Sequence, residues 1–318
     1  MTIHPILVKT TRRFWRFQWN LLMNGLGPSD KEGNYIRPQS KFLSISDNEL
    51  ILDNEEEWQI IIGRTCPWAH RVWIMSNLLN IPKSNLTKAI PNTISGKWEF
   101  ESKWHGYNNI AEIYNQNSSS RHRATLPILG KFSKSKGHLL RILCNESLSI
   151  LEILNNIAKP NNGLNLIPYE KEEETKILTQ LIHKKINNGV YKCGFARNQR
   201  AYELASDELF CFLDELENKI KKQGPWLLGE CLTIADICLF STLIRWETIY
   251  LPLFKCSKSN LYDYANLLSW LKRFYSLEGI AKTCEFNFWV KDYYEAMFPL
   301  NPSNIIPIAS SIPKFLIK

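Results

Sequence analysis

The stretch GRTCPWAHRVW, residues 63–73, places Cys66 and Pro67 directly after an apolar run. A thiol is a nucleophile only as its thiolate, and its ordinary pKa of about 8.5 leaves little thiolate at neutral pH. Proline suits the first position of a helix, and the free amides and dipole of a helix start stabilise an anion. The stretch therefore predicts a nucleophilic cysteine with a lowered pKa. The alternative is a cysteine buried for packing alone.

Ala69 stands three residues after Cys66, where a dithiol enzyme carries its second cysteine. A mixed disulfide on Cys66 must therefore be resolved by an external thiol, and glutathione is the abundant one in a reducing compartment. The eight cysteines contain no C-x-x-C pair, and no histidine pair has ligand spacing, so we expect no metal. Without a secretory signal, a reducing, cytoplasmic location is expected.

Two further motifs suit glutathione. Pro127 in TLPIL falls within a strand pattern, and a cis bond would explain a proline there. The Leu126 backbone would then be free to pair with the backbone of a bound cysteinyl group. Glu146 and Ser147 begin a helix pattern, where amides and a hydroxyl suit a carboxylate and Glu146 suits an ammonium group. Simple helix capping is the alternative for these two residues.

The elements that must position these groups follow a strand-helix-strand, strand-strand-helix order. The order is that of a thioredoxin-like domain, and residues 92–123 are expected to be a connection with one helix around Ile110. The expected strands are 57–62, 85–90, 124–130 and 138–144, and the expected helices are 67–80 and 146–157.

Helical patterns alone follow residue 168. Between Tyr202 and Ile220 apolar residues recur every three or four positions, and Thr233 and Asp236 have the spacing of a capping box. The fold class expected is α/β plus all-α. We expect an arm over 1–50, a thioredoxin-like glutathione-binding domain over 51–160, an all-helical domain over 168–300 and a tail over 301–318.

Composition argues against two other classes of protein. The net charge is +8, but Lys9, Arg12, Arg13 and Arg16 supply four of these charges, which leaves a dispersed +4 and no nucleic-acid signature. No apolar run is long enough for integral membrane insertion. The first 25 residues contain no acidic residue and mix Arg with Trp, Phe and Leu. They are interpreted as an arm packed on the body, with organelle targeting or a membrane-surface helix left open.

The sequence resembles the Xi class of glutathione transferases, the glutathionyl-hydroquinone reductases, from about residue 32 to 307. CPWAHR and INNGVYKCGFA are the most specific of the shared motifs, whereas LTIAD is generic to the fold. The matching stretches are EGNYIRPQSKF, CPWAHR, GKWEF, RATLPIL, NES, INNGVYKCGFA, PWLLGE, LTIAD, RWETIYLPLFKC and LNPSNIIP.

The resemblance implies an all-helical glutathione-transferase domain after the thioredoxin-like one, a homodimer, and reduction of glutathionyl-hydroquinones through a Cys66-glutathione disulfide. Glutathione would be the co-substrate and glutathionylated quinol-type molecules the partners. By carry-over, the residues that hold glutathione would be Trp98, Arg123, Leu126, Glu146 and Ser147, and the hydroquinone would lie against Tyr191 and Tyr250. His70 and Arg71 would give electrostatic support at most. An Omega-like reductase of dehydroascorbate or mixed disulfides, or a non-catalytic binding module, stays open as an alternative.

The chain also departs from the family pattern. Leu126 replaces the usual valine, and the strand PILG lacks the usual tryptophan. Phe288, Asp292 and Met297 stand where members of the family usually carry histidines. Substrate choice and assembly are therefore the properties expected to differ, whereas the thiol chemistry should not.

Overall fold

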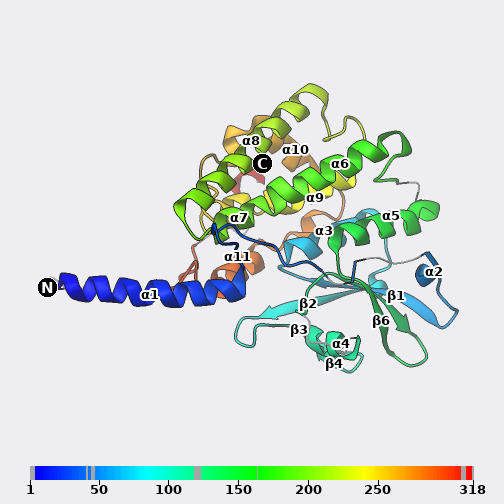
Figure 1. Ribbon diagram of the computed structural model, residues 1–318. Coiled ribbons are helices and arrows are strands. Elements are labelled where there is room, and N and C mark those ends of the chain that lie inside the picture. The colour runs from blue at the N-terminus through cyan, green and yellow to red at the C-terminus, as the bar shows by residue number, and fades with distance from the viewer. Residues whose placement is uncertain are drawn as a thin grey trace.

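The computed structural model describes residues 4–40, 42–43, 47–117, 123–162, 164–308 and 313–316 of the chain. Its N-terminal half is a mixed sheet with helices, and its C-terminal half is helical throughout (Figure 1). This is the fold class expected from the sequence, a thioredoxin-like half followed by an all-helical one. The first helix, α1 (Pro5–Leu26), leaves this body as an extension.

One sheet with the order β4-β3-β2-β1-β5-β6 forms the N-terminal half of the described chain. Strands β1 and β2 are parallel, and the remaining neighbours are antiparallel. Ile60, Ile61 and Ile62 in β1 are at most 1% exposed, as expected for a strand covered on both faces. The strands are β1 (Glu56–Gly63), β2 (Leu86–Asn92), β3 (Lys97–Trp104), β4 (Tyr107–Asn109), β5 (Ile128–Ser133) and β6 (His138–Cys144).

The connection expected over 92–123 is wrong in one respect, because it contains β3 and β4 as well as helix α4 (Ile110–Asn117). Trp98, Phe100 and Trp104 alternate with polar residues in β3, and this period of two is the signal of a half-buried strand. The hairpin strand expected from residue 124 begins only at Ile128, after the Leu126–Pro127 bond, which is cis as expected.

Helix α3 (Pro67–Leu78) lies between the sheet and the helical half (Figure 1). Every residue from Pro67 to Ser76 is buried, because α3 packs on β1 on one side and on α5 and α9 on others. Helix α5 (Ser147–Asn162) runs past Pro160 instead of ending before Lys159. A proline this close to the last turn removes only one backbone hydrogen bond, so the helix can pass it.

The helical half begins with α6 (Glu172–Ile182). Tyr191 lies in α7, between Gly189 and Gly194, two glycines that predict either a turn or a close backbone approach. The structure shows the close approach: both glycines are helical, and a Cβ on Gly194 would lie 2.6 Å from the Phe254 ring. These glycines therefore serve close packing. The other helices are α7 (Gly189–Phe195), α8 (Gln199–Gln223), α9 (Ile234–Leu243), α10 (Ala265–Tyr275) and α11 (Phe286–Ala296), with π-helical turns at His183–Asn187 and Trp246–Tyr250.

Residues 27–40 and 42–43, here called the strap, form hydrogen bonds with both halves of the molecule. Arg197 donates to the carbonyl of Gly27 at 2.8 Å, and its amide donates to the carbonyl of Gly33 at 3.0 Å. At the other end, Phe42 and Asn145 exchange hydrogen bonds of 3.2 and 3.1 Å. The packing on the body that was expected for the first 25 residues is wrong for most of α1, which is exposed. The strap that follows α1 is the part that bonds to the body.

The Asp236 carboxylate organises the start of α9. It accepts hydrogen bonds from the Thr233 amide and hydroxyl, from the Leu227 amide and from the Trp270 indole, all between 2.9 and 3.0 Å. The capping box expected from the Thr233–Asp236 spacing is confirmed. The same carboxylate also fixes the preceding loop and α10 against α9.

Replacing Asp236 with alanine should lower the free energy of unfolding by about 2–5 kcal/mol, because a helix cap is lost and buried donors lose their acceptor. Urea denaturation measures this change. Asp263→Ala is the matched control, since Asp263 closes a capping box in an exposed turn, and it should cost less than about 1 kcal/mol. Equal losses would contradict the assigned role of Asp236.

Candidate active site

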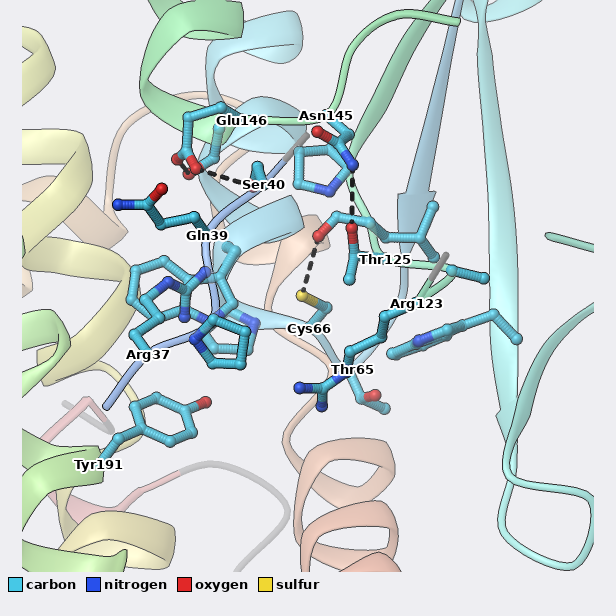
Figure 2. Close-up of a pocket in the computed structure, with 18 of the residues that line it drawn as sticks. Arg37, Gln39, Ser40, Thr65, Cys66, Arg123, Thr125, Asn145, Glu146 and Tyr191 are labelled. Atoms are coloured by element: carbon cyan, nitrogen blue, oxygen red, sulfur yellow. Dashed lines mark hydrogen bonds between the residues drawn. The ribbon is translucent and has the colours of Figure 1, made fainter. Parts of the chain in front are cut away.

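A cavity of about 440 Å³ opens between the two halves and the strap. Cys66 lies near its middle in Figure 2, with Glu146 toward one end and Tyr191 toward the other. The strap supplies Tyr35, Arg37 and Ser40 to the lining. The cavity also contains the sequence-predicted residues Trp98, Arg123, Leu126, Glu146, Ser147 and Tyr191.

Cys66 occupies the N-cap position of α3, and Pro67 is the first residue of that helix, as expected. Its Sγ lies 3.6 Å from the carbonyl oxygen of Leu126, to which the thiol donates. Gly63, at the end of β1, makes this corner possible, because a Cβ there would lie 2.8 Å from the Trp98 ring. The nucleophile candidate therefore faces the cavity between α3 and the loop before β5.

The lowering of the Cys66 pKa predicted from the sequence is not found in the structure. Burial raises the pKa of the Cys66 thiol, and this effect outweighs the opposing effects of the Ala69 and Trp68 amides and of Arg37 and Arg245. The helix start thus supplies the anion-stabilising groups that the sequence indicated. It does so inside a desolvated pocket, where the uncharged thiol is favoured.

Glu146 and Ser147 lie at the start of α5, bound to residues from other elements. The Ser40 hydroxyl of the strap donates to Glu146 Oε2 at 3.0 Å, and Arg71 Nη1 donates to Ser147 Oγ at 3.2 Å. Arg71 Nη1 also lies 3.4 Å from His183 Nδ1, and burial lowers the pKa of His183 to about 3. A neutral histidine can therefore accept from Arg71.

The guanidinium group of Arg37, a residue of the strap, lies over the Trp68 ring at the cavity. The guanidinium carbon of Arg37 lies 3.6 Å from the centroid of the Trp68 ring, and that of Arg71 lies 4.6 Å away. The Trp68 ring is stacked on Tyr191, with centroids 5.9 Å apart. Cation–π contacts of this kind gain strength where water is excluded, so the strap cation is held close to the nucleophile.

Beneath α3, His70 and Arg245 connect the two halves. The Thr283 hydroxyl donates to the Ile280 carbonyl at 2.8 Å, so it accepts from His70 Nε2 at 2.8 Å. His70 Nδ1 then accepts from Arg245 Nη1 at 2.9 Å. Burial and Arg245 hold the pKa of His70 well below its usual value, which agrees with this neutral tautomer.

Three tyrosine hydroxyls meet at the helical wall of the cavity. Tyr293 Oη lies 2.9 Å from Tyr191 Oη and 3.3 Å from Tyr250 Oη. Tyr191 and Tyr293 line the cavity, whereas Tyr250 is 0% exposed and lies behind Tyr293 instead. Burial raises the pKa of all three phenols, so each is a neutral hydroxyl donor or acceptor.

Phe288, Asp292 and Met297, which the resemblance singles out as departures from the family pattern, have different environments. Asp292 and Met297 line the cavity, whereas Phe288 lies on the surface, 4.2 Å beneath the guanidinium carbon of Arg64. Burial raises the pKa of Asp292 to about 6, and the neighbouring Thr65 side chain acts on it in the opposite direction. Asp292 Oδ1 is buried and has no hydrogen-bond partner among the described residues.

Sequence reasoning missed Tyr293 and the strap residues Arg37 and Ser40 as parts of the cavity, and it named Asp292 only as a departure from the family pattern that bears on substrate choice. EGNYIRPQSKF contributed to the resemblance, but no local spacing connects Ser40 to Glu146, 106 residues away. Tyr293 forms part of the helical pattern of α11, where an aromatic residue is usually core. A charged and hydroxyl-rich loop before the first strand was the available signal.

The comparisons with known proteins agree with this geometry. Residues 199–273 match the family "Glutathione S-transferase, C-terminal domain". The chain is 33% identical to the glutathionyl-hydroquinone reductase YqjG of Escherichia coli over 80% of this chain and 79% of the relative. It is 31% identical to the glutathionyl-hydroquinone reductase PcpF of Sphingobium chlorophenolicum over 94% and 95%.

Solved structures show the same likeness. The Xi glutathione transferase of Phanerochaete chrysosporium superposes with a TM-score of 0.78 at 27% identity, covering 89% of this chain and 94% of that one. Glutathione-bound YqjG superposes with a TM-score of 0.73 at 29% identity, covering 82% and 87%. The fold and the cysteine-centred site define a glutathione transferase. More specifically, the chain belongs to the Xi-class family of glutathionyl-hydroquinone reductases, and it is an enzyme of that class.

Asp292 should make stability depend on pH in one direction. The folded state holds its proton with a pKa of about 6, whereas an unfolded aspartate titrates near about 3.9. Asp292 therefore lowers the free energy of unfolding as pH rises through this window. The free energy of unfolding of Asp292→Asn minus that of the native chain should increase by about 1–2 kcal/mol between pH 5 and pH 8. Urea denaturation measures this difference. Exposed Glu278→Gln is the control, and an unchanged difference for Asp292→Asn would refute the assignment.

Proposed function

We propose that the enzyme reduces glutathionyl-hydroquinones to hydroquinones through a disulfide between Cys66 and glutathione. One arrangement carries this proposal. A single cavity holds Cys66 between the polar groups at the start of α5 and the hydroxyls of Tyr191 and Tyr293. Quinol-type substrates and the homodimer expected from the sequence belong to the same proposal.

The polar end of the cavity suits glutathione. Glu146 offers a carboxylate to the γ-glutamyl ammonium group, and the Ser147 hydroxyl with the α5 amides suits the neighbouring carboxylate. The Leu126 backbone, beside Cys66 Sγ, can pair with the cysteinyl backbone. Trp98 and Arg123 also line the cavity, and Arg123 is exposed. We assign them to the glycyl end of glutathione, whose carboxylate a guanidinium group can bind. These roles place the glutathione sulfur next to Cys66.

The reaction balances as two exchanges. The Cys66 thiolate attacks the glutathione sulfur of the substrate, and a sulfur–sulfur bond forms while the bond from that sulfur to the ring carbon breaks. The ring carbon takes the electron pair and one proton, which balances the proton that the Cys66 thiol gives up to become the thiolate, so the aromatic fragment leaves as the hydroquinone. A second glutathione then attacks the mixed disulfide as its thiolate, which yields oxidised glutathione and restores Cys66.

The tyrosine pair supports the aromatic part of this assignment. A departing hydroquinone carries ring oxygens on which charge develops, and hydroxyl donors aimed there lower the barrier. The Tyr191–Tyr293 pair offers such donors at the cavity wall. Tyr250 lies behind them and is bonded to Tyr293, so its proposed role becomes that of orienting Tyr293.

Cys66→Ser should lower turnover of a glutathionyl-hydroquinone by about a thousandfold or more, because a serine hydroxyl is far less acidic and forms no disulfide. Steady-state kinetics with glutathione measure this loss, and circular dichroism checks the fold. The exposed cysteine in α8 gives the control Cys211→Ser, which should keep normal turnover. A Cys66→Ser variant that kept its turnover would exclude Cys66 as the nucleophile.

Tyr191→Phe and Tyr293→Phe should each lower kcat/KM for a glutathionyl-hydroquinone by about ten- to a hundredfold. Reduction of a small aliphatic mixed disulfide has no aromatic leaving group and should change by less than about twofold. Tyr250→Phe should have the smaller effect, because its hydroxyl does not line the cavity. Equal losses on both substrates would make the tyrosines structural. No loss on either would favour an Omega-like reductase of mixed disulfides or dehydroascorbate.

A further inference from the structure

Helix α1 has no role in the cavity over most of its length. It runs from Pro5 to Leu26 and projects from the body (Figure 1). Its C-terminal end packs through Met23, which is 0% exposed, and through Trp19, whose indole donates to the Pro299 carbonyl at 3.0 Å. The turns before Trp19 are almost wholly exposed, so their sequence is not explained by packing on this chain.

Five exposed apolar side chains of α1 form a stripe on the face opposite the body, whereas Trp15 and Leu22, 41% and 44% exposed, lie nearer the packed face. At 100° per residue, the mean direction of this stripe lies about half a turn from that of Trp19, Met23 and Leu26. The chain therefore uses one face of the helix for its own packing and leaves a second apolar face uncovered. The stripe consists of Ile6 (69% exposed), Leu7 (60%), Phe14 (62%), Phe17 (68%) and Leu21 (65%).

A basic stripe flanks the apolar one. It consists of Lys9, Arg12, Arg13 and Arg16, which at 100° per residue lie within about 100° of one another on one side of α1. All four are exposed, none forms an ion pair with another residue of the described ranges, and α1 contains no acidic residue. Four concentrated positive charges beside exposed Phe and Leu select a partner that is both anionic and apolar.

We propose that α1 binds the surface of a lipid bilayer with anionic headgroups. The apolar stripe would enter the boundary between headgroups and acyl chains, and the basic stripe would meet the lipid phosphates. None of the helices in the described part of the chain is long and apolar enough to cross a membrane. With its four cations α1 therefore lies in the plane of the surface.

A second copy of the chain is the competing occupant of the stripe, and charge argues against it. Pairing two α1 helices along their apolar stripes would bring two sets of four cations close together without an acidic residue on either helix. Repulsion between the two sets of positive charges would oppose association of the two helices. An anionic bilayer instead offers attraction worth about fivefold in affinity for each Lys or Arg near the surface.

Vesicle co-sedimentation of the full chain tests the proposal. Binding to phosphatidylcholine vesicles that contain phosphatidylglycerol should exceed binding to phosphatidylcholine alone by about tenfold or more, and should weaken in about 0.5 M salt. The triple variant Arg12→Gln, Arg13→Gln, Arg16→Gln should lose about a hundredfold, and Phe14→Ser with Phe17→Ser should lose binding at any salt concentration. The matched control removes three exposed lysines elsewhere: Lys221→Gln, Lys222→Gln and Lys272→Gln.

Three results would overturn the proposal: no binding, equal binding to both vesicle types, or an equal loss in the lysine control. A fourth such result comes from light scattering without lipid. It would be a dimer of the native chain that the double variant Phe14→Ser with Phe17→Ser dissociates, while neither the native chain nor the variant binds vesicles. Glutathione-dependent turnover without vesicles should be unchanged in all of these variants. Because the readout is binding, it is independent of the proposed substrate.

Discussion

Two guanidinium groups are buried at the junction of the halves, and the position of the nucleophile depends on them. Arg71 is 1% exposed and Arg245 0%, and neither has a carboxylate within ion-pair distance among the described residues. Burying an unpaired charge costs several kcal/mol, and here Trp68 and Trp289 rings and neutral hydrogen-bond acceptors offset it. These acceptors come from both halves, so the halves must stay docked. Helix α3, with Cys66 at its start, is fixed by that requirement.

The same burial explains why the site is assembled from neutral groups. His70 and His183 must be uncharged to accept from the arginines, and the tyrosines are uncharged because a phenolate would be desolvated. Burial raises the pKa of Cys66, Tyr250 and Tyr293, and the positive charge of Arg245 acts to lower it. The fixed positive charges are therefore already in place to stabilise negative charge that develops during a reaction, and the site needs little reorganisation.

Local sequence signals were sufficient where one short stretch makes one element. Cys66-Pro67 after β1, the cis Leu126–Pro127 bond and the Asp236 cap could all be predicted from a few neighbouring residues. Strand β3 was missed although Trp98, Phe100 and Trp104 alternate, because a helical signal at Ile110 dominated the segment. Tyr250 was assigned to the hydroquinone site from the resemblance, and a family motif does not say that Tyr293, to which Tyr250 is hydrogen bonded, lines the cavity in its place. The strap and Asp292 depend on contacts between distant segments, which no local pattern encodes.

The strap has a consequence for synthesis of the chain. Its partners are far downstream: Phe42 bonds to Asn145 across 103 residues, and Gly27 to Arg197 across 170. A ribosome adds about 5–20 residues per second. Arg197 is therefore synthesised about 10–30 s after the strap. The sheet can form in that interval, but the cavity cannot close. The thiol of Cys66 is therefore open to cellular oxidants until the helical half is complete.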